Sequence, residues 1–169
     1  MTKNLNGTAA LVTAGGTGLG FGIAKRLAED GCLVTICARR EAVLAAAVEE
    51  IGNDSRYIVC DVTDDGQVKA AVAAAAQPLG RLDIAVANAG GGGGAGPLVM
   101  TDLEAWNATL ALTLTSTLST IKNAAPIMVR GNGGAIIAVS SILSKQITSS
   151  PMKFAWCRRR VTRPGMSAS

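Results

Sequence analysis

The fold is indicated most clearly by the stretch Ala10-Leu11-Val12-Thr13-Ala14-Gly15-Gly16-Thr17-Gly18-Leu19-Gly20-Phe21-Gly22-Ile23-Ala24. An apolar run ends in a glycine-rich turn, and a helical pattern begins directly after it. This is the layout of a strand, a phosphate-binding loop and a helix N-terminus. Glycines let the backbone approach a pyrophosphate closely, and the free N–H groups of the first helical turn face the anion. Because glycine turns are common, the stretch needs support from the rest of the chain.

Apolar strands alternate with helices along most of the sequence. Strands are predicted at 8–13, 33–38, 56–60, 82–87 and 135–139, and helices at 18–30, 41–51, 64–76 and 102–130. This alternation predicts an α/β fold with three layers, a Rossmann-like doubly wound parallel sheet covered by helices on both faces. Right-handed crossovers favour the strand order 3-2-1-4-5.

The pattern dissolves after Ser150. We expect residues 1–150 to form one dinucleotide-binding Rossmann domain that is incomplete at its C-terminal end, and residues 151–169 to form an irregular basic tail. Residues 1–150 carry 11 basic and 12 acidic side chains, whereas residues 151–169 carry five basic ones and no acid. The main body therefore offers no basic surface for nucleic acid.

Three kinds of site or segment are not expected. No apolar run reaches the roughly 20 residues that span a bilayer, and the N-terminus lacks the apolar stretch of a signal peptide, so a cytoplasmic protein is predicted. The chain contains no histidine, and its four cysteines have no C-x-x-C spacing. We therefore expect packing cysteines and no metal site.

With these segments in place, the chain resembles the classical short-chain dehydrogenase/reductase family over roughly residues 5–150. The family's T-G-x-x-x-G-x-G loop matches residues 13–20, its Asp-Val pair near the adenine matches Asp61-Val62, and its N-N-A-G motif matches residues 87–90. The resemblance implies cofactor binding by Thr13, Gly15, Gly16, Thr17, Gly18, Leu19, Gly20, Asp61, Val62, Asn88, Ala89 and Gly90. It also implies that Ser141 is the catalytic serine, with Ser140 as the alternative.

Charge at the end of the second predicted strand bears on the choice of cofactor. A carboxylate at that place would bind the 2′-hydroxyl of NAD and repel a 2′-phosphate. The sequence has Arg39-Arg40 there instead. A guanidinium pair suits a phosphate, so NADP is predicted in preference to NAD. The alternative is a solvated arginine pair at the start of a helix.

The sequence departs from the family pattern at three places. Ala14 replaces the first glycine of the loop, which costs on the order of 1–2 kcal/mol if that position needs a positive φ. Thr113 stands where the family usually has an asparagine on the long helix. The family's Y-x-x-x-K motif is absent: without a gap, Phe154 and Arg158 occupy its two key places, and the only tyrosine, Tyr57, lies in the third strand. Loss of a principal proton donor costs roughly 10²–10⁴ in rate.

Three functions stay open from the sequence. The first is a working NADP-dependent oxidoreductase acting on a small alcohol or carbonyl compound, and the second is a non-catalytic nucleotide-binding remnant of one. The third is a protein that binds anionic surfaces through its basic tail. We interpret residues from about Leu143 or Ser144 onward as the product of a shifted reading frame, alternative processing or an erroneous gene model, which leaves the family's C-terminal part truncated. A family-type homo-oligomer and a stable fold are both doubtful on this interpretation.

Overall fold

The structure, a computed structural model, describes residues 4–91, 100, 102–140 and 157–161, the last of these by their backbone. Its strands are β1 (Ala9–Thr13), β2 (Leu33–Ala38), β3 (Arg56–Val59), β4 (Ile84–Ala87), β5 (Gly134–Ala138) and β6 (Cys157–Val161). Its helices are α1 (Gly18–Glu29), α2 (Glu41–Ile51), α3 (Asp65–Ala76), α4 (Leu103–Leu110), the π-helical segment η2 (Ala111–Thr115) and α5 (Ser116–Arg130).

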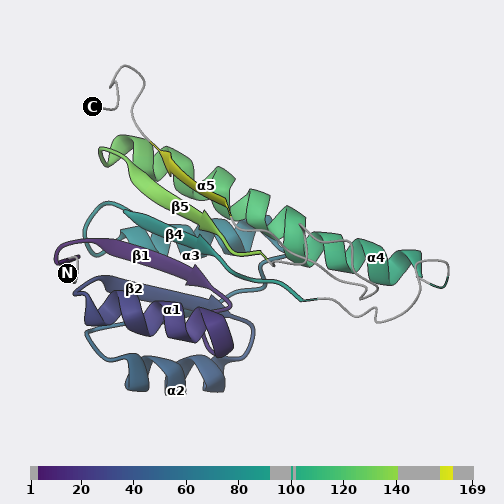
Figure 1. Cartoon of the computed structure of the whole chain (residues 1–169), viewed down its shortest axis with the longest axis horizontal. Helices are drawn as coiled ribbons and strands as arrows, with labels where there is room; N and C mark the ends of the chain where they lie inside the picture. The colour runs from purple at the N-terminus through teal and green to yellow at the C-terminus, as the bar shows by residue number, and fades with distance from the viewer. Residues whose placement is uncertain (1–3, 92–99, 101, 141–156, 162–169) are drawn as a thin grey trace.

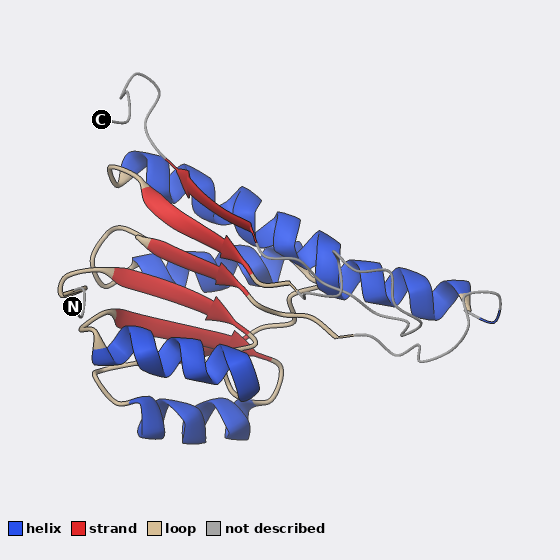
Figure 2. Cartoon of the chain, viewed as in Figure 1, coloured by secondary structure: helices blue, strands red, loops and turns tan. Residues whose placement is uncertain are grey.

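The strands form a single sheet in the order β3-β2-β1-β4-β5-β6 (Figure 1). The first five strands are parallel, in the predicted order 3-2-1-4-5, and this prediction is confirmed. Helices α1 and α2 lie on one face of the sheet and α3 and α5 on the other, which gives the three predicted layers (Figure 2).

Two apolar clusters hold the layers together, one on each face. In β1, Leu11 packs with α3 and α5, whereas Ala10 and Val12 pack with α1 and α2. All five residues of β1 are buried. A parallel strand covered on both faces needs apolar residues at successive positions, which explains the continuous apolar run in the sequence.

The long helix predicted at 102–130 differs from the observed one. It is α-helical as far as Leu110, turns into the π-helical segment η2, and resumes as α5. Along it, the hydroxyls of Thr109, Thr113 and Thr117 each donate to the carbonyl oxygen four residues earlier. Such bonds compete with the backbone pattern, and the helical period in the sequence does not distinguish a π turn from an α turn.

The structure also differs from the expected irregular tail. Cys157–Val161 form β6, which pairs antiparallel with β5, so β5 is not the edge strand that the sequence suggested. Pairing of this kind uses backbone groups alone. A free edge can therefore order a segment that has no apolar period of its own.

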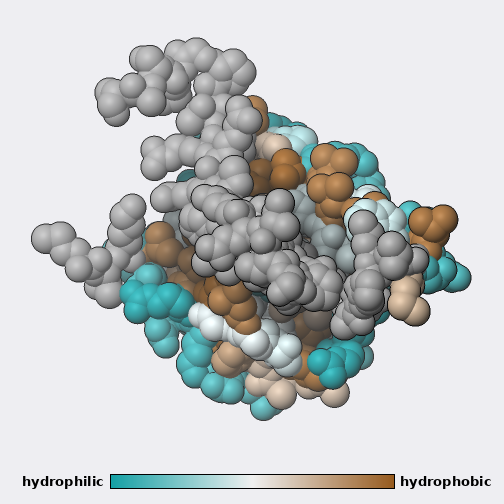
Figure 3. Space-filling model, turned by 45° about the vertical axis from the view of Figure 1, so that its right-hand side comes forward, coloured by the Kyte–Doolittle hydropathy of each residue, from teal (hydrophilic) through white to brown (hydrophobic). Residues whose placement is uncertain are grey.

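Helix α4 continues the line of α5 past the end of the sheet (Figure 1). Its side chains Leu103 and Trp106, and Leu114 and Leu118 further along, are exposed. Figure 3 shows apolar and hydrophilic surface interspersed on the side where this end of the molecule comes forward. Among the helices that the structure describes, none is long and apolar enough to cross a membrane.

Candidate nucleotide-binding site

The glycine-rich loop connects β1 to α1 at the carboxyl edge of the sheet. Ala14 adopts the left-handed conformation with a φ of 52°, and Gly18 has a φ of 58°. A Cβ atom on Gly20 would come 2.4 Å from the Ala14 carbonyl oxygen and 2.5 Å from the Asn88 amide nitrogen. Because a side chain does not fit there, Gly20 lets α1 pack closely against the loop.

Thr13 and Asn88 fasten this loop to the end of β4. The Asn88 amide nitrogen donates to the carbonyl oxygens of Thr13 at 3.0 Å and Ala14 at 3.4 Å. The Thr13 hydroxyl accepts from the backbone nitrogens of Asn88 at 2.9 Å and Ala89 at 3.0 Å, and donates to the Val86 carbonyl. Thr13 and Asn88, which the resemblance gives as cofactor contacts, therefore hold the loop in place.

The N-terminus of α1 lacks a side-chain cap. Thr17, at the N-cap position, makes no side-chain capping bond, and the first turn of α1 contains no acidic residue. By contrast, Asp64 caps α3 and Asp102 caps α4 through bonds to backbone nitrogens. The first-turn N–H groups of α1 and its partial positive charge remain available to an anion.

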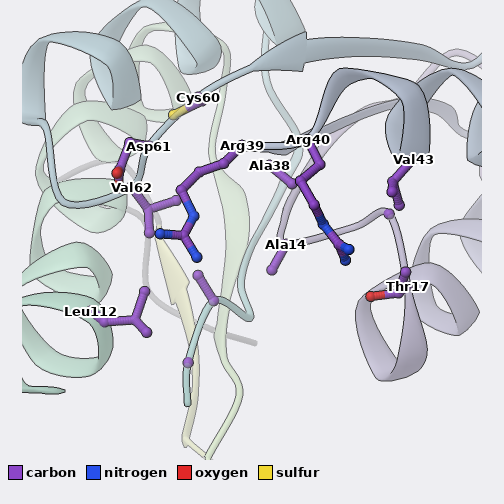
Figure 4. A pocket seen from close by; sticks show the side chains of 13 residues that line it. Ala14, Thr17, Ala38, Arg39, Arg40, Val43, Cys60, Asp61, Val62 and Leu112 are labelled. Carbon is purple, nitrogen blue, oxygen red and sulfur yellow. The ribbon is translucent and has the colours of Figure 1, made fainter. Parts of the chain in front are cut away.

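A cavity of about 470 Å³ lies beside this N-terminus, at the carboxyl ends of β1, β2 and β3. Its described lining residues are Ala14, Gly16, Thr17, Ala38, Arg39, Arg40, Val43, Cys60, Asp61, Val62, Ala89, Gly90 and Leu112. In Figure 4 the guanidinium groups of Arg39 and Arg40 both extend from the end of β2, and Ala14 lies between them in this view. The cavity thus joins two positively charged side chains to an uncapped helix N-terminus.

Asp61 is the negatively charged residue among those described as lining the first cavity. Its carboxylate accepts from the Thr63 backbone nitrogen at 3.0 Å and from the Thr63 hydroxyl at 2.8 Å. These bonds, with a smaller contribution from the charge of Arg39, hold the pKa of Asp61 below its ordinary value. The carboxylate is ionised at neutral pH and is fixed in orientation by its own turn.

A second cavity of about 330 Å³ adjoins the first, because Ala89 and Gly90 line both. Its other described lining residues are Leu19, Asn88, Gly91, Thr113, Leu114, Thr117, Ala138, Val139 and Ser140. The two cavities follow the carboxyl ends of the strands on either side of the loop. This is the crevice where ligands bind in doubly wound sheets.

The sequence-predicted residues divide into five groups. Gly16, Thr17, Arg39, Arg40, Asp61, Val62, Ala89 and Gly90 line the first cavity, and Leu19, Asn88, Ala89 and Gly90 line the second. Gly18 borders a shallower groove between α1 and α2. Thr13, Gly15 and Gly20 line none of these cavities, since Thr13 fastens the loop and a Cβ on Gly15 would collide with Ile36. Ser141 lies outside the described residues.

Sequence reasoning missed several lining residues. Val43, Cys60 and Leu112 contribute side chains to the first cavity. Cys60 directly precedes Asp61 at a strand end, which is a signal that could have been used. Leu112 comes from η2, far away in sequence, and no local pattern indicates its place. The three described cysteines are free and buried, as the sequence predicts.

A parallel sheet in the order 3-2-1-4-5, with a glycine-rich turn and two adjoining cavities at its carboxyl edge, defines a Rossmann-type NAD(P)-binding fold. The family described as "short chain dehydrogenase" matches residues 8–152. The chain belongs to this family.

Individual relatives agree with this assignment. The 2,5-dichloro-2,5-cyclohexadiene-1,4-diol dehydrogenase LinX of Sphingobium indicum is 36% identical over 146 residues, which are 85% of this chain and 58% of LinX. A short-chain type dehydrogenase/reductase from Mycobacterium ulcerans superposes with a TM-score of 0.81 at 36% identity, covering 88% of this chain and 55% of that one. A short chain dehydrogenase from Burkholderia cenocepacia, solved in complex with NADP, gives 0.80 at 34% identity, covering 88% and 61%. The chain thus spans a little over half the length of these relatives.

Proposed function

We propose that this chain binds NADP across the two adjoining cavities and prefers it to NAD. The observation that carries the proposal is the pairing of Arg39 and Arg40 with the uncapped N-terminus of α1 around one cavity. NADP carries a pyrophosphate and a separate 2′-phosphate, so it presents two anionic groups to two positive features.

The residues present fit such a ligand. The first turn of α1 would receive the pyrophosphate, and Arg39 and Arg40 would receive the 2′-phosphate at the end of β2. Asp61 and Val62 would lie beside the adenine. The NADP complex of the Burkholderia cenocepacia relative supports the choice of ligand.

The proposed reaction is the one typical of the family, hydride transfer between NADP(H) and a small alcohol or carbonyl compound. Bound NADPH supplies the hydride. Among the described residues, Ser140 brings a hydroxyl to the second cavity, next to the sequence-predicted Ser141. Because phenylalanine and arginine replace the family's tyrosine and lysine, we propose that this step is slow or absent.

Titration calorimetry with NADP and NAD tests the cofactor proposal. Wild type is expected to bind NADP more tightly, and Arg39→Ala to lose roughly 10- to 100-fold in NADP affinity, since a charge-assisted hydrogen bond contributes about 1.5–3 kcal/mol. Arg56→Ala, which removes an exposed arginine from β3 outside the cavity, is the matched control. Equal affinity of wild type for the two cofactors would contradict the proposed preference.

Turnover is a separate measurement. NADPH oxidation with a panel of ketones, lost in Ser141→Ala, would support a working oxidoreductase. NADPH that binds and is never oxidised would support the non-catalytic alternative.

A further inference from the structure

Thr113 in η2 and Thr117 at the start of α5 have a role that goes beyond the cofactor contacts described above. We propose that Thr113 and Thr117 form an acceptor-only wall of the second cavity and bind a ligand group that carries O–H or N–H donors. This inference rests on the proposed function in so far as the ligand is the nicotinamide end of the cofactor.

The two side chains share one face of the helix. Thr113 lies in η2 and Thr117 in the first turn of α5, four residues later, and both line the second cavity. Residues at this spacing are neighbours on a helix surface. Both threonines are half-buried, so part of each side chain stays accessible from the cavity that they line.

Each hydroxyl has already used its single proton. Thr113 donates to the Thr109 carbonyl oxygen at 2.6 Å, and Thr117 donates to the Thr113 carbonyl oxygen at 2.8 Å. A hydroxyl has one donor and two acceptor lone pairs. What remains for a ligand is acceptor capacity, so the wall favours a donor and gives a carbonyl or carboxylate oxygen no partner.

Apart from Asn88 and Ser140, the other described side chains that line the second cavity are apolar or glycine. Leu19, Leu114 and Val139 give it apolar surface, and no charged side chain is among the described residues that line it. Where apolar contacts are unselective, a few fixed polar groups set orientation and specificity. The two threonines supply such groups on the helix side of the cavity.

Two ligands carry matching donors. The nicotinamide riboside of the cofactor has ribose hydroxyls and a carboxamide N–H₂, and the second cavity adjoins the first because Ala89 and Gly90 line both. An alcohol substrate has a hydroxyl. The chemistry is the same for both, and the experiment separates the sources.

The test compares wild type with Thr113→Val, Thr117→Val and the control Thr109→Val. Thr109 is also half-buried on this helix and bonds back to the Ala105 carbonyl at 2.8 Å, but it does not line the second cavity. Valine keeps the shape and the β-branch while removing the hydroxyl. Each protein is titrated with NADPH and with 2′-phospho-ADP-ribose, which lacks the nicotinamide, and its binding of cyclohexanol is followed by ligand-observed NMR.

We expect Thr113→Val and Thr117→Val each to weaken NADPH binding about fivefold, the equivalent of one neutral hydrogen bond. Binding of 2′-phospho-ADP-ribose, and all binding by Thr109→Val, should stay as in wild type. Weakened cyclohexanol binding with unchanged NADPH affinity would support the wall with the alcohol as its ligand.

Two results would overturn the inference. One is that both variants bind NADPH and cyclohexanol as wild type does. The other is an equal loss for NADPH and 2′-phospho-ADP-ribose, which would show a general effect on the fold. If wild type binds neither nucleotide, the proposed function fails, and the cyclohexanol measurement alone decides on the threonines.

Discussion

Ala14 shows how a single residue departs from its family and remains compatible with the fold. The sequence raised the question of whether this position needs a positive φ, and the structure answers it with 52°. Its methyl group lines the first cavity, so the residue affects both the backbone energy and the space for a ligand. The positive φ lies at Ala14 itself, and neither Gly15 nor Gly16 adopts one in its place.

Ala14→Gly is expected to raise the free energy of unfolding by about 1 kcal/mol. Relief of the left-handed conformation contributes on the order of 1–2 kcal/mol, and the greater freedom of glycine in the unfolded chain offsets part of it. Urea unfolding followed by circular dichroism measures the change.

Ala46→Gly is the control for Ala14→Gly. Ala46 is exposed in the middle of α2, where glycine lowers helix stability by about 1 kcal/mol. The same chemical change should therefore have opposite signs at the two positions. A loss of stability at both would show that Ala14 is not strained.

At the scale of elements, the bond network between β1 and β4 decides whether the loop is preorganised. Asn88→Ala removes the amide that donates to the Thr13 and Ala14 carbonyls. We expect a loss of about 1–3 kcal/mol in the free energy of unfolding, because these acceptors lose their partner. NADP affinity should fall with it. Asn107→Ala, an exposed change on α4, should leave both quantities close to wild type.

Asp65 joins α3 to α5. Its carboxylate accepts from the Lys122 ammonium at 2.7 Å, the Ser119 hydroxyl at 2.6 Å and the Asn123 amide at 3.0 Å. The bond from Lys122, followed by those from Ser119 and Asn123, lowers the pKa of Asp65 from 3.8 to about 2. The stabilisation is therefore complete above pH 4 and is lost as the pH falls towards 2.

Asp65→Asn should lower the urea midpoint at neutral pH and remove part of the loss of stability between pH 4 and 2. Urea unfolding of wild type and Asp65→Asn at neutral pH, pH 4 and pH 2 measures both effects. In a Lys122→Gln background the same change should have a smaller effect, because the two side chains act on one interaction. An identical pH profile for wild type and Asp65→Asn would contradict the assignment.

Two elements could not be predicted locally. The helical period of the η2 segment does not distinguish a π turn from an α turn, and within it the Thr113 hydroxyl donates to the Thr109 carbonyl oxygen. Strand β6 forms from an arginine-rich run because β5 offers it a free edge. The partner that orders β6 is another strand, so no pattern within the run itself indicates it.

At the scale of the whole molecule, ligand binding and folding are linked. The proposed NADP site uses the ends of β1, β2 and β3 and the start of α1, so it exists only when the sheet is assembled. A ligand that binds only the folded state at 100 times its Kd adds about 2.7 kcal/mol to the free energy of unfolding. NADP at that excess should raise the Tm by several degrees.

Thermal unfolding with NADP, NAD and no ligand measures this effect. At equal concentrations NAD should give a smaller shift than NADP, and Arg39→Ala should bring the two shifts together. A Tm that is independent of both nucleotides at millimolar concentration would contradict nucleotide binding by the folded chain.

Local periodicity predicts the α/β class, turn chemistry predicts the loop at residues 13–20, and charge marks the arginines at the end of β2. The strand order follows from the handedness of the crossovers. The sequence does not indicate that Thr13 and Asn88 fasten the loop, that Leu112 lines the first cavity, or that Thr113 and Thr117 share a cavity with Ser140. These arrangements depend on segments that lie far apart along the chain. Contacts between segments that are 75 residues apart, such as that of Thr13 with Asn88, form only when the crossovers bring the carboxyl ends of the strands together.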